Sequence, residues 1–294
     1  MTYWDDLARH HGGECIDEIW LNHPLVRAEA NRLVSGDAAV WPTQWLKTQV
    51  SGLTDGVSIG CGTGAFERDV VPRGVVSQMI GIDEAHQPLE RATRLAVEAG
   101  LADRIEYVQT DANQWLKAHP NSFDAVFFHA SLHHFARPAE MLATVCSALR
   151  PGGWLYLDEY IGPARDEWSL FRLALPNLAY RLLPFGVRRP WLVRAPINRE
   201  DPTEAIASSS IVTAVRQNFD DVRILPYGGN LLSVVYPNLH RTAARFDAAV
   251  SRLITFERML RRLGAKAYYA VILARTAPIA ETMSPTSSPS GGAF

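Results

Sequence analysis

Two adjacent histidines, His133 and His134, are the side chains of this chain best suited to moving a proton. Imidazole has an unperturbed pKa of about 6.5, so it can take a proton from a hydroxyl near neutral pH. The pair follows Ala125–Phe128, an apolar run that predicts a strand buried on both faces. An enzyme that activates a hydroxyl nucleophile must align it and remove its proton. Either histidine is therefore a candidate general base; the alternative is that both only shape a turn.

Asp158, Glu159 and Tyr160 follow a second apolar run, Trp154–Leu157. At the end of a strand, such side chains can bind an acceptor molecule, polarise a hydroxyl, or hold a divalent cation together with a histidine. No clear set of oxygen ligands accompanies them, so we predict hydrogen bonds at the rim of a pocket and no metal site. Glu159 is an alternative catalytic base, and Tyr160 is a candidate contact for the substrate.

A glycine-rich segment, Ser58–Gly64, follows a short apolar run and places glycines at positions 60, 62 and 64. Glycines at these positions let the chain turn sharply and let a ligand approach the backbone closely. The segment also fits the dinucleotide-binding fingerprint, with Ala65 as the third small residue. Taken alone, it is also compatible with a tight turn between a strand and a helix.

Two acidic residues follow the next two expected strands. Asp83 lies 23 positions after Gly60 and can accept two hydrogen bonds from a ribose diol. Asp111 can accept a hydrogen bond from an adenine amino group. Each could instead cap the helix that follows it, Asp83 before Glu84 and Asp111 before the helix that carries Trp115. The two carboxylates favour a bound nucleoside but do not choose between cofactors.

Strands and helices alternate around these residues. The expected strands are short apolar runs at 57–59, 79–82, 105–108, 125–128 and 154–157, followed after a break by 222–225 and 268–274. The expected helices have apolar residues at helical spacing and cover about 65–71, 84–99, 138–149 and 242–263. Such alternation requires crossover connections, so it predicts a mostly parallel, doubly wound α/β sheet. Ligands of such sheets bind at the carboxyl ends of the strands, where the candidate residues lie.

The chain is expected to divide into five parts. They are an N-terminal helical cap (1–50), a cofactor-binding core (51–160), an insertion that forms a lid (161–221), the C-terminal part of the core sheet (222–277) and a disordered tail (278–294) rich in Pro, Ser, Thr and Gly. The first part should bury one helical face, formed by Leu25, Ala28, Leu33 and Val34, before Gly36 stops the helix.

The insertion interleaves apolar and basic residues between Phe171 and Arg194. One interpretation is a lid that binds an anionic or lipid-linked acceptor, or touches a membrane surface. The alternative is an amphipathic cap helix whose basic face is solvated.

The series of motifs resembles the class I S-adenosylmethionine-dependent methyltransferases, which have a Rossmann-like fold. The matching segments, in order and at matching spacing, are Gly60–Gly64, Ile82-Asp83, Asp111-Ala112, Phe123–Val126 and Ala148–Gly153. The resemblance covers residues 50–160, and the final helix and strand more loosely. It implies that the last strand runs antiparallel, as a hairpin with its predecessor. Asp201–Ile206 and Pro226–Leu232 are similar to a bacterial subgroup with the same long insertion.

The resemblance implies that the cofactor is S-adenosylmethionine. The expected cofactor contacts are Gly60, Cys61, Gly62, Gly64, Asp83, Asp111, Ala112 and His129. Among these, the glycines would lie against the methionine part, Asp83 would hold the ribose and Asp111 the adenine. Tyr160 and Tyr227 are the expected substrate contacts.

The function that we expect is O-methylation of a small-molecule or sugar hydroxyl, by in-line transfer with a histidine base. Methylation of carbon or nitrogen in a natural-product pathway is the alternative. A nicotinamide-dependent oxidoreductase would leave Asp111, the Phe123-Asp124 pair and the Pro151–Gly153 turn unexplained. A protein that binds the cofactor without catalysis is the fourth interpretation.

Composition narrows the class of protein further. The formal net charge of −2 argues against a general nucleic-acid binder, because such proteins carry a basic surplus. Three scattered cysteines, Cys15, Cys61 and Cys146, are too few for a disulfide framework or a zinc cluster. No run approaches about 18 apolar residues, so stable membrane insertion is not expected. The first residues lack a signal-peptide pattern, which favours a cytoplasmic enzyme. The sequence leaves open whether the protein forms a homodimer.

Overall fold

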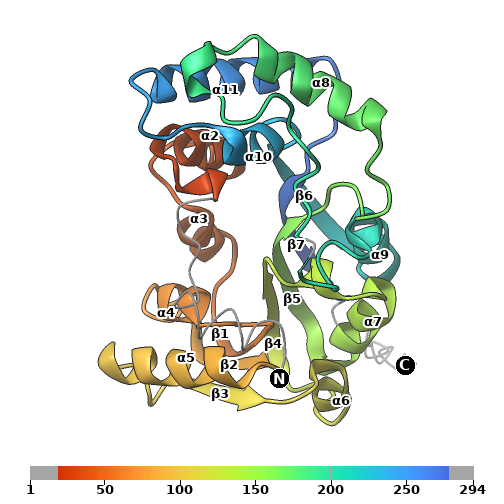
Figure 1. The fold of residues 1–294 in the computed structure, drawn as a ribbon. Helices are drawn as coiled ribbons and strands as arrows, with labels where there is room; N and C mark the ends of the chain where they lie inside the picture. Colours follow the sequence, from red (N-terminus) through yellow and green to blue (C-terminus); the bar gives the residue numbers. More distant parts are fainter. Residues whose placement is uncertain (1–18, 199, 278–294) are drawn as a thin grey trace, which may run out of the picture.

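The candidate residues lie on a seven-stranded sheet (Figure 1). The computed structural model describes residues 19–198 and 200–277. The strands, which lie in the order β3-β2-β1-β4-β5-β7-β6, are β1 (Leu53–Ile59), β2 (Val76–Asp83), β3 (Ile105–Gln109), β4 (Phe123–His129), β5 (Leu149–Tyr160), β6 (Asp221–Gly228) and β7 (Tyr269–Arg275). All seven expected strands are present, and most extend beyond the apolar run that predicted them.

The strand directions confirm the expected sheet. β1 pairs in parallel with β2 and β4, β2 with β3, and β4 with β5. β7 runs antiparallel to both β5 and β6, which confirms the expected direction of the last strand, but residues 229–268 separate it from β6, so the two strands form no tight hairpin. Because β1 has β2 on one side and β4 on the other, the topological switch point lies beside its carboxyl end, where ligands of such sheets bind.

The helices occupy the segments between the strands. They are α2 (Pro24–Ser35), α3 (Pro42–Gln49), α4 (Ala65–Val70), α5 (His86–Glu98), α6 (Ala112–Lys117), α7 (Pro138–Ala148), α8 (Leu170–Arg181), α9 (Ile211–Asn218), α10 (Leu232–Val235) and α11 (Phe246–Arg262). The short 3₁₀ helices include η3 (Leu132–His134) and η4 (Phe185–Val187).

Helices cover both faces of the sheet (Figure 1). One core layer packs α6, α7 and α9 against Val126, Phe128 and Leu155. The other packs α2, α3 and α4 against Phe127 and Tyr156. Phe127 and Phe128 belong to different layers because neighbouring side chains on a strand point to opposite faces. The expected doubly wound α/β class is therefore confirmed.

Helix α9 lies inside the range 161–221, which the sequence predicts to be an insertion, yet it packs against α7. Its buried Ile211, Ala214 and Val215 join the same core layer as α7. Residues 211–218 therefore belong with the layers of the sheet, and the part of the insertion that forms a cap ends before them.

A helical cap lies at one end of the molecule, at the top of Figure 1. It contains α8 from the insertion, together with α10, α11 and α2, which contact one another in the pairs α8–α10, α10–α11 and α11–α2. The cap therefore draws on three separate parts of the chain. The expected domain limits stay a prediction, but the arrangement favours assigning α11 to the cap.

The buried face predicted for α2 is only partly confirmed: Val34 is buried, and Leu33 packs against the core. Leu25 is 43% exposed, and Ala28 and Leu33 are only half-buried. The residues that α2 buries are Val26, Glu29, Ala30, Asn31 and Val34. Two of these are polar and have partners: Glu29 accepts hydrogen bonds from Arg258 of α11, and the Asn31 side chain donates to the Ala38 carbonyl. A pattern based on apolar residues alone misses a face of this kind.

Three expectations lie outside the described residues: the absence of a signal peptide, the environment of Cys15, and the disordered tail at 278–294. Within the described ranges, no helix combines the length and the apolar character needed to cross a bilayer.

Candidate active site

The glycine-rich turn connects the carboxyl end of β1 to α4. Gly60, Gly62 and Gly64 have φ values of 66°, 53° and 71°, in the left-handed region that residues with a Cβ rarely adopt. A Cβ on Gly60 would come within 2.7 Å of the Cβ of Ser131, so the turn also packs closely against the segment after β4. At Gly62 no described atom lies within 4 Å of that position. A ligand can therefore approach the backbone there, as the cofactor prediction requires.

Asp83 braces this turn from the end of β2. Its Oδ2 accepts a hydrogen bond from the Gly62 amide at 2.8 Å, and its Oδ1 accepts one from the Ala85 amide at 2.9 Å. The cap residue of α5 is Ala85, so the interpretation of Asp83 as the helix cap is wrong. Each carboxylate oxygen has a second lone pair, so Asp83 can hold the turn and still accept from a ribose hydroxyl.

Asp111 does cap a helix. Its Oδ1 accepts a hydrogen bond from the Gln114 amide at 2.6 Å at the start of α6, and the residue is exposed. Ala112, which follows it, is buried. The pKa of nearby Glu84 is raised by its burial and by the charges of Asp111 and Asp83, which places all three carboxylates at the same edge of the sheet. The cap and the expected adenine contact are compatible, because the cap occupies one oxygen.

Cys61 and His129 flank the turn. Cys61 is a free cysteine, and its thiol pKa lies well above the ordinary value because of burial and the charges of Glu67 and Asp83. The thiol is therefore protonated and unreactive near neutral pH. The His129 ring ends β4, stacks on Phe66 at a centroid distance of 5.2 Å, and is 49% exposed. Their expected contacts with the cofactor stay a prediction.

Glu159 is buried beneath η3, with 1% of its surface exposed. Its Oε1 accepts from the amides of Ser131 and Leu132, and its Oε2 accepts from the Tyr160 amide at 2.9 Å and from Nδ1 of His133 at 2.7 Å. Burial raises the pKa of Glu159, but the charge and hydrogen bond of His133 and the amide donors lower it by more. The pKa of Glu159 therefore lies below its ordinary value. This carboxylate is enclosed and engaged, which favours a role in positioning His133 over the predicted role as a catalytic base; the predicted role stays a prediction.

His133 is held in one tautomer by this contact. A carboxylate can only accept, so Nδ1 of His133 carries the hydrogen and Nε2 bears the lone pair in the neutral ring. Burial lowers the pKa of His133, but Glu159, Glu204 and Asp201 raise it more, so the net shift is upward. Nε2 lies 4.0 Å from Oε2 of Glu204. His133 therefore directs its basic nitrogen toward a second carboxylate.

His134 is oriented by the insertion. Its Nδ1 lies 3.1 Å from Oγ1 of Thr203, whose hydroxyl donates to Oδ1 of Asp201 at 2.6 Å. Since the Thr203 hydrogen is used there, Nδ1 of His134 must donate, and Nε2 again bears the lone pair. Burial and the neighbouring His133 charge lower the pKa of His134 despite the acidic groups nearby. The two rings, 4.1 Å apart between centroids, therefore divide into a more basic and a less basic imidazole.

Asp201, Thr203 and Glu204 are site residues that the sequence did not predict as such. They come from the insertion and contact a turn about 70 residues earlier. Asp201 is 1% exposed, and its Oδ2 lies 3.4 Å from Nδ1 of His134. The available signal was the return of acidic residues at Glu200, after residues 168–198, which contain none.

The two expected substrate contacts have engaged hydroxyl groups. Tyr160 donates to the Pro163 carbonyl at 2.9 Å, and Tyr227 donates to Oδ1 of Asp158 at 2.6 Å. Both residues are buried. The Tyr160 ring meets the His133 ring edge-on at a centroid distance of 6.2 Å, so Tyr160 lies at the site as an apolar wall. Any contact of these tyrosines with an acceptor would use the rings.

Three side chains in the described part of the chain come close enough to hold a metal ion. Donor atoms of His133, His134 and Glu204 lie within 4.8 Å of one another. The same arrangement is compatible with acid–base chemistry, because each Nδ1 is engaged and each Nε2 bears a lone pair in the neutral ring. Our sequence prediction of no metal is not tested by this geometry and stays a prediction.

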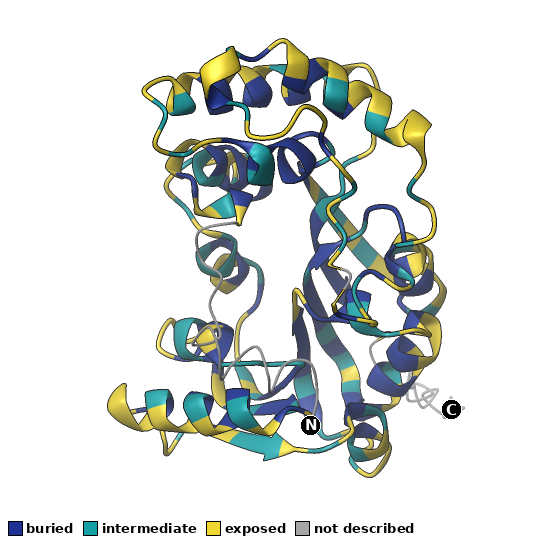
Figure 2. Ribbon diagram, viewed as in Figure 1, coloured by how far each residue is buried: buried dark blue, intermediate teal, exposed yellow. Residues whose placement is uncertain are grey.

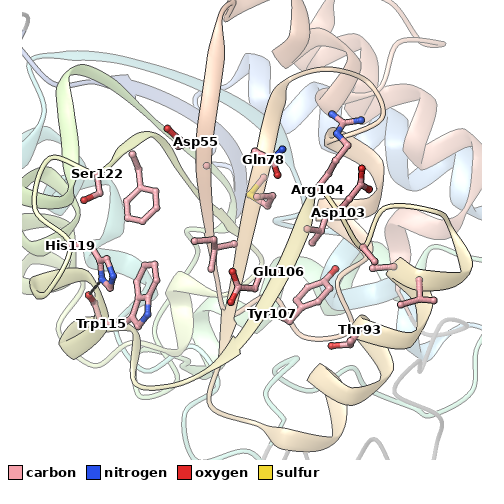
Figure 3. Close-up of a pocket in the computed structure, with 18 of the residues that line it drawn as sticks. Asp55, Gln78, Thr93, Asp103, Arg104, Glu106, Tyr107, Trp115, His119 and Ser122 are labelled. Carbon is pink, nitrogen blue, oxygen red and sulfur yellow. Dashed lines mark hydrogen bonds between the residues drawn. The ribbon is translucent and has the colours of Figure 1, made fainter.

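A groove of about 800 Å³ lies elsewhere on the molecule (Figure 3). It is bordered by Asp55, Gln78 and Glu106 from the amino halves of β1, β2 and β3, and by Trp115 and His119. Its lining includes neither the glycine-rich turn nor the two histidines. It is therefore separate from the site described above.

Comparison with known proteins identifies one domain of this chain. Residues 57–157 match the family model described as a methyltransferase domain. The chain contains a class I S-adenosylmethionine-dependent methyltransferase domain. The match covers β1 to β5, with the glycine-rich turn, Asp83, Asp111 and η3. It decides between the two cofactors that the turn left open, in favour of S-adenosylmethionine.

The methyltransferase domain is also similar to curated proteins. The ubiquinone biosynthesis O-methyltransferase of Saccharophagus degradans is 31% identical over 130 residues, which cover 44% of this chain and 52% of that protein. The enzyme of the same name from Leptothrix cholodnii is 31% identical over 147 residues, covering 48% and 59%. The chain thus matches little more than half the length of these relatives.

Solved structures share the fold of this chain. A protein described as a sarcosine dimethylglycine methyltransferase from Galdieria sulphuraria aligns with a TM-score of 0.54 at 16% identity, covering 94% of this chain and 98% of that one. Phosphoethanolamine N-methyltransferase 2 of Haemonchus contortus, solved with S-adenosylhomocysteine, aligns with a TM-score of 0.50 at 14% identity, covering 95% and 61%. At these identities the likeness extends to the fold alone.

Proposed function

We propose that this chain transfers a methyl group from S-adenosylmethionine to a hydroxyl of a small molecule, with His133 as the general base. The observation that carries the proposal is the His133–Glu159 pair, which leaves Nε2 of His133 basic and directed toward Glu204. When bound, S-adenosylmethionine supplies a methyl group on a positively charged sulfur.

The residues of this chain fit that cofactor. The open backbone at Gly62 admits a ligand, and Asp83 and Asp111 lie at the ends of β2 and β3, where a nucleoside would extend. Ser131 ties the turn before the histidines to β1, because its hydroxyl donates to the Ile59 carbonyl at 2.6 Å. The cofactor turn and the histidine turn are therefore held together, which favours a fixed distance between methyl donor and base.

The space between His133 and Glu204 suits a hydroxyl. A hydroxyl oxygen between Nε2 of His133 and Oε2 of Glu204, which lie 4.0 Å apart, can donate its single hydrogen to Nε2. Burial raises the pKa of Glu204, and a protonated Glu204 would donate to the same oxygen. The hydroxyl oxygen would take the methyl group that bound S-adenosylmethionine supplies, and Nε2 of His133 would take the hydroxyl proton. Glu159 stabilises the imidazolium that results.

Transfer to oxygen is favoured over transfer to carbon or a basic nitrogen because the site provides a base for an acidic proton. The curated relatives are named as O-methyltransferases, which supports the same choice. The small-molecule class, with a sugar or glycan hydroxyl included, rests on the sequence resemblance, and the cytoplasmic location stays a prediction from the sequence.

An assay for S-adenosylhomocysteine formation with phenol, catechol and sugar acceptors would test the proposal. H133Q should lower kcat by about 10²–10⁴, the usual contribution of a general base, while cofactor affinity measured by calorimetry stays within about twofold of wild type. H134Q is the matched control and should lower kcat less. Normal turnover of H133Q on an accepted substrate would refute the assigned base, and failure of wild type to bind the cofactor would refute the proposed function.

A further inference from the structure

The outer side of α8 carries a row of exposed apolar side chains. Phe171, Leu175, Leu178 and Leu182 recur at steps of four, three and four residues, which places them on one helical face, and Phe185 of η4 continues the row. Their exposed fractions, in the order Phe171, Leu175, Leu178, Leu182 and Phe185, are 89%, 45%, 56%, 59% and 75%. We call these five residues the outer face of α8.

This face is not the one that packs against the protein. The residues that α8 buries are Pro176, Ala179 and Tyr180, and the helix contacts α10. Helix α8 is therefore apolar on two separate faces, of which one is used within the fold. Figure 2 shows the exposed side of α8 along the outer edge of the cap. The segment after η4 adds Trp191 and Leu192, exposed to 84% and 51%.

Positive charge surrounds the same surface. Residues 168–198 contain five arginines, at 172, 181, 188, 189 and 194, and no acidic residue. Elsewhere on the chain Arg73, Arg150 and Arg258 form ion pairs, but among the described residues no carboxylate pairs with any of these five. Arg188 lies over the Phe185 ring at 5.3 Å, so apolar and basic groups are interleaved.

We propose that the outer face of α8, with Trp191 and the surrounding arginines, docks this protein on the surface of an anionic phospholipid bilayer. A surface of exposed large apolar side chains is unusual on a protein that stays in water. Apolar residues inserted at the headgroup boundary, with arginines at the phosphates around them, satisfy both features. A second copy of the chain would bring the unpaired arginines of two copies together, which disfavours it as the occupant.

The proposal concerns docking in the plane of the bilayer, without a membrane-crossing segment. It does not depend on methyl transfer, because binding to vesicles can be measured without cofactor or acceptor. The same insertion carries Thr203 and Glu204 to the candidate active site.

Sedimentation with vesicles tests the docking. The wild-type chain should bind vesicles of phosphatidylglycerol and phosphatidylcholine in equal parts, and bind vesicles of phosphatidylcholine alone far more weakly. F171S/L178S should weaken binding by at least about tenfold, because two large apolar side chains no longer leave water. The matched control L25S/V97S removes exposed apolar residues from α2 and α5 and should bind as wild type does.

The charge arm uses R181Q/R189Q. Each basic side chain near an anionic surface contributes a factor of about five, so this variant should bind about 25-fold more weakly. R94Q/R137Q, which removes exposed arginines from other surfaces, is its control. Wild type that ignores anionic vesicles, or F171S/L178S that binds them as tightly as wild type, would overturn the proposal. So would a concentration-dependent dimer that F171S/L178S abolishes, since the face would then belong to a second copy.

Discussion

Replacing Glu159 by glutamine isolates the positioning role that the structure gives this residue. The carboxylate accepts four hydrogen bonds, from three backbone amides and from Nδ1 of His133. In E159Q one oxygen becomes an amide group that can only donate, so at least one of these donors loses its partner. Breaking a buried pair that includes a charge costs about 3–5 kcal/mol. At the lower figure the Tm should fall by roughly 6–12 °C.

The kinetic consequence of E159Q follows from the direction in which Glu159 shifts the pKa of His133. Glu159 raises the pKa of His133, and the base works only when it is unprotonated. In wild type, kcat/KM should therefore rise with pH through a value above the ordinary histidine pKa of about 6.5. Without the Glu159 carboxylate, less negative charge opposes the effect of burial, which lowers the pKa of His133, so this pKa falls. In E159Q the rising limb should move to lower pH while the plateau falls by about 10²–10⁴.

The assay is a pH profile of kcat/KM for wild type and E159Q, taken at a temperature where circular dichroism shows both folded. A structural role alone would lower the plateau and leave the midpoint of the rising limb unchanged. That result would refute the assignment of His133 and Glu159 as base and positioning residue. E204Q, which leaves the Glu159 hydrogen bonds intact, is the matched variant and should move the limb less.

Three further outcomes are expected. D83A should weaken S-adenosylhomocysteine binding by about 1–3 kcal/mol, the range for unpaired buried polar groups, and unchanged affinity by calorimetry would remove Asp83 from the ribose contact. The hydrogen bond to Arg258 lowers the pKa of Glu29, and burial opposes this shift. The contribution of Glu29 to stability is therefore present above the ordinary Glu pKa of about 4.3 and is lost as the pH falls through the lowered value. R258A should flatten this part of the plot of unfolding free energy against pH, and a plot parallel to that of wild type would contradict this reasoning. EDTA should leave methyl transfer unchanged if His133, His134 and Glu204 act without a metal, whereas loss of activity that zinc or magnesium restores would assign them to a cation.

The sheet and the cofactor side of the site could be read from the sequence because their signals are local. Apolar runs marked all seven strands, and Gly60, Asp83 and Asp111 follow directly from strand ends that must share one edge of a parallel sheet. The face of α2 could not be read in this way. Its buried Glu29 is stabilised by Arg258, more than 200 residues away, so no window of sequence around α2 contains the reason.

The acceptor side of the site depends on contacts of the same long range. Nothing near His134 in the sequence indicates Thr203, and only the fold brings the insertion back to η3. The sequence indicated that Glu159 could act as a base, but its role depends on where its side chain points. The carboxylate lies beneath η3 and is enclosed by the backbone amides that donate to it. The residue types therefore indicated which side chains could take part in proton transfer. Their burial and hydrogen-bond partners are the reason that we propose His133 as the base and Glu159 as the positioning residue.

A crystal structure with S-adenosylhomocysteine bound is the most direct test of the account. We expect the ribose hydroxyls to donate to Asp83, the amino-acid part to lie along Gly60–Gly64, and the sulfur to face the space between Nε2 of His133 and Glu204. A ligand that leaves Asp83 without a ribose contact, or a sulfur directed away from His133, would contradict it.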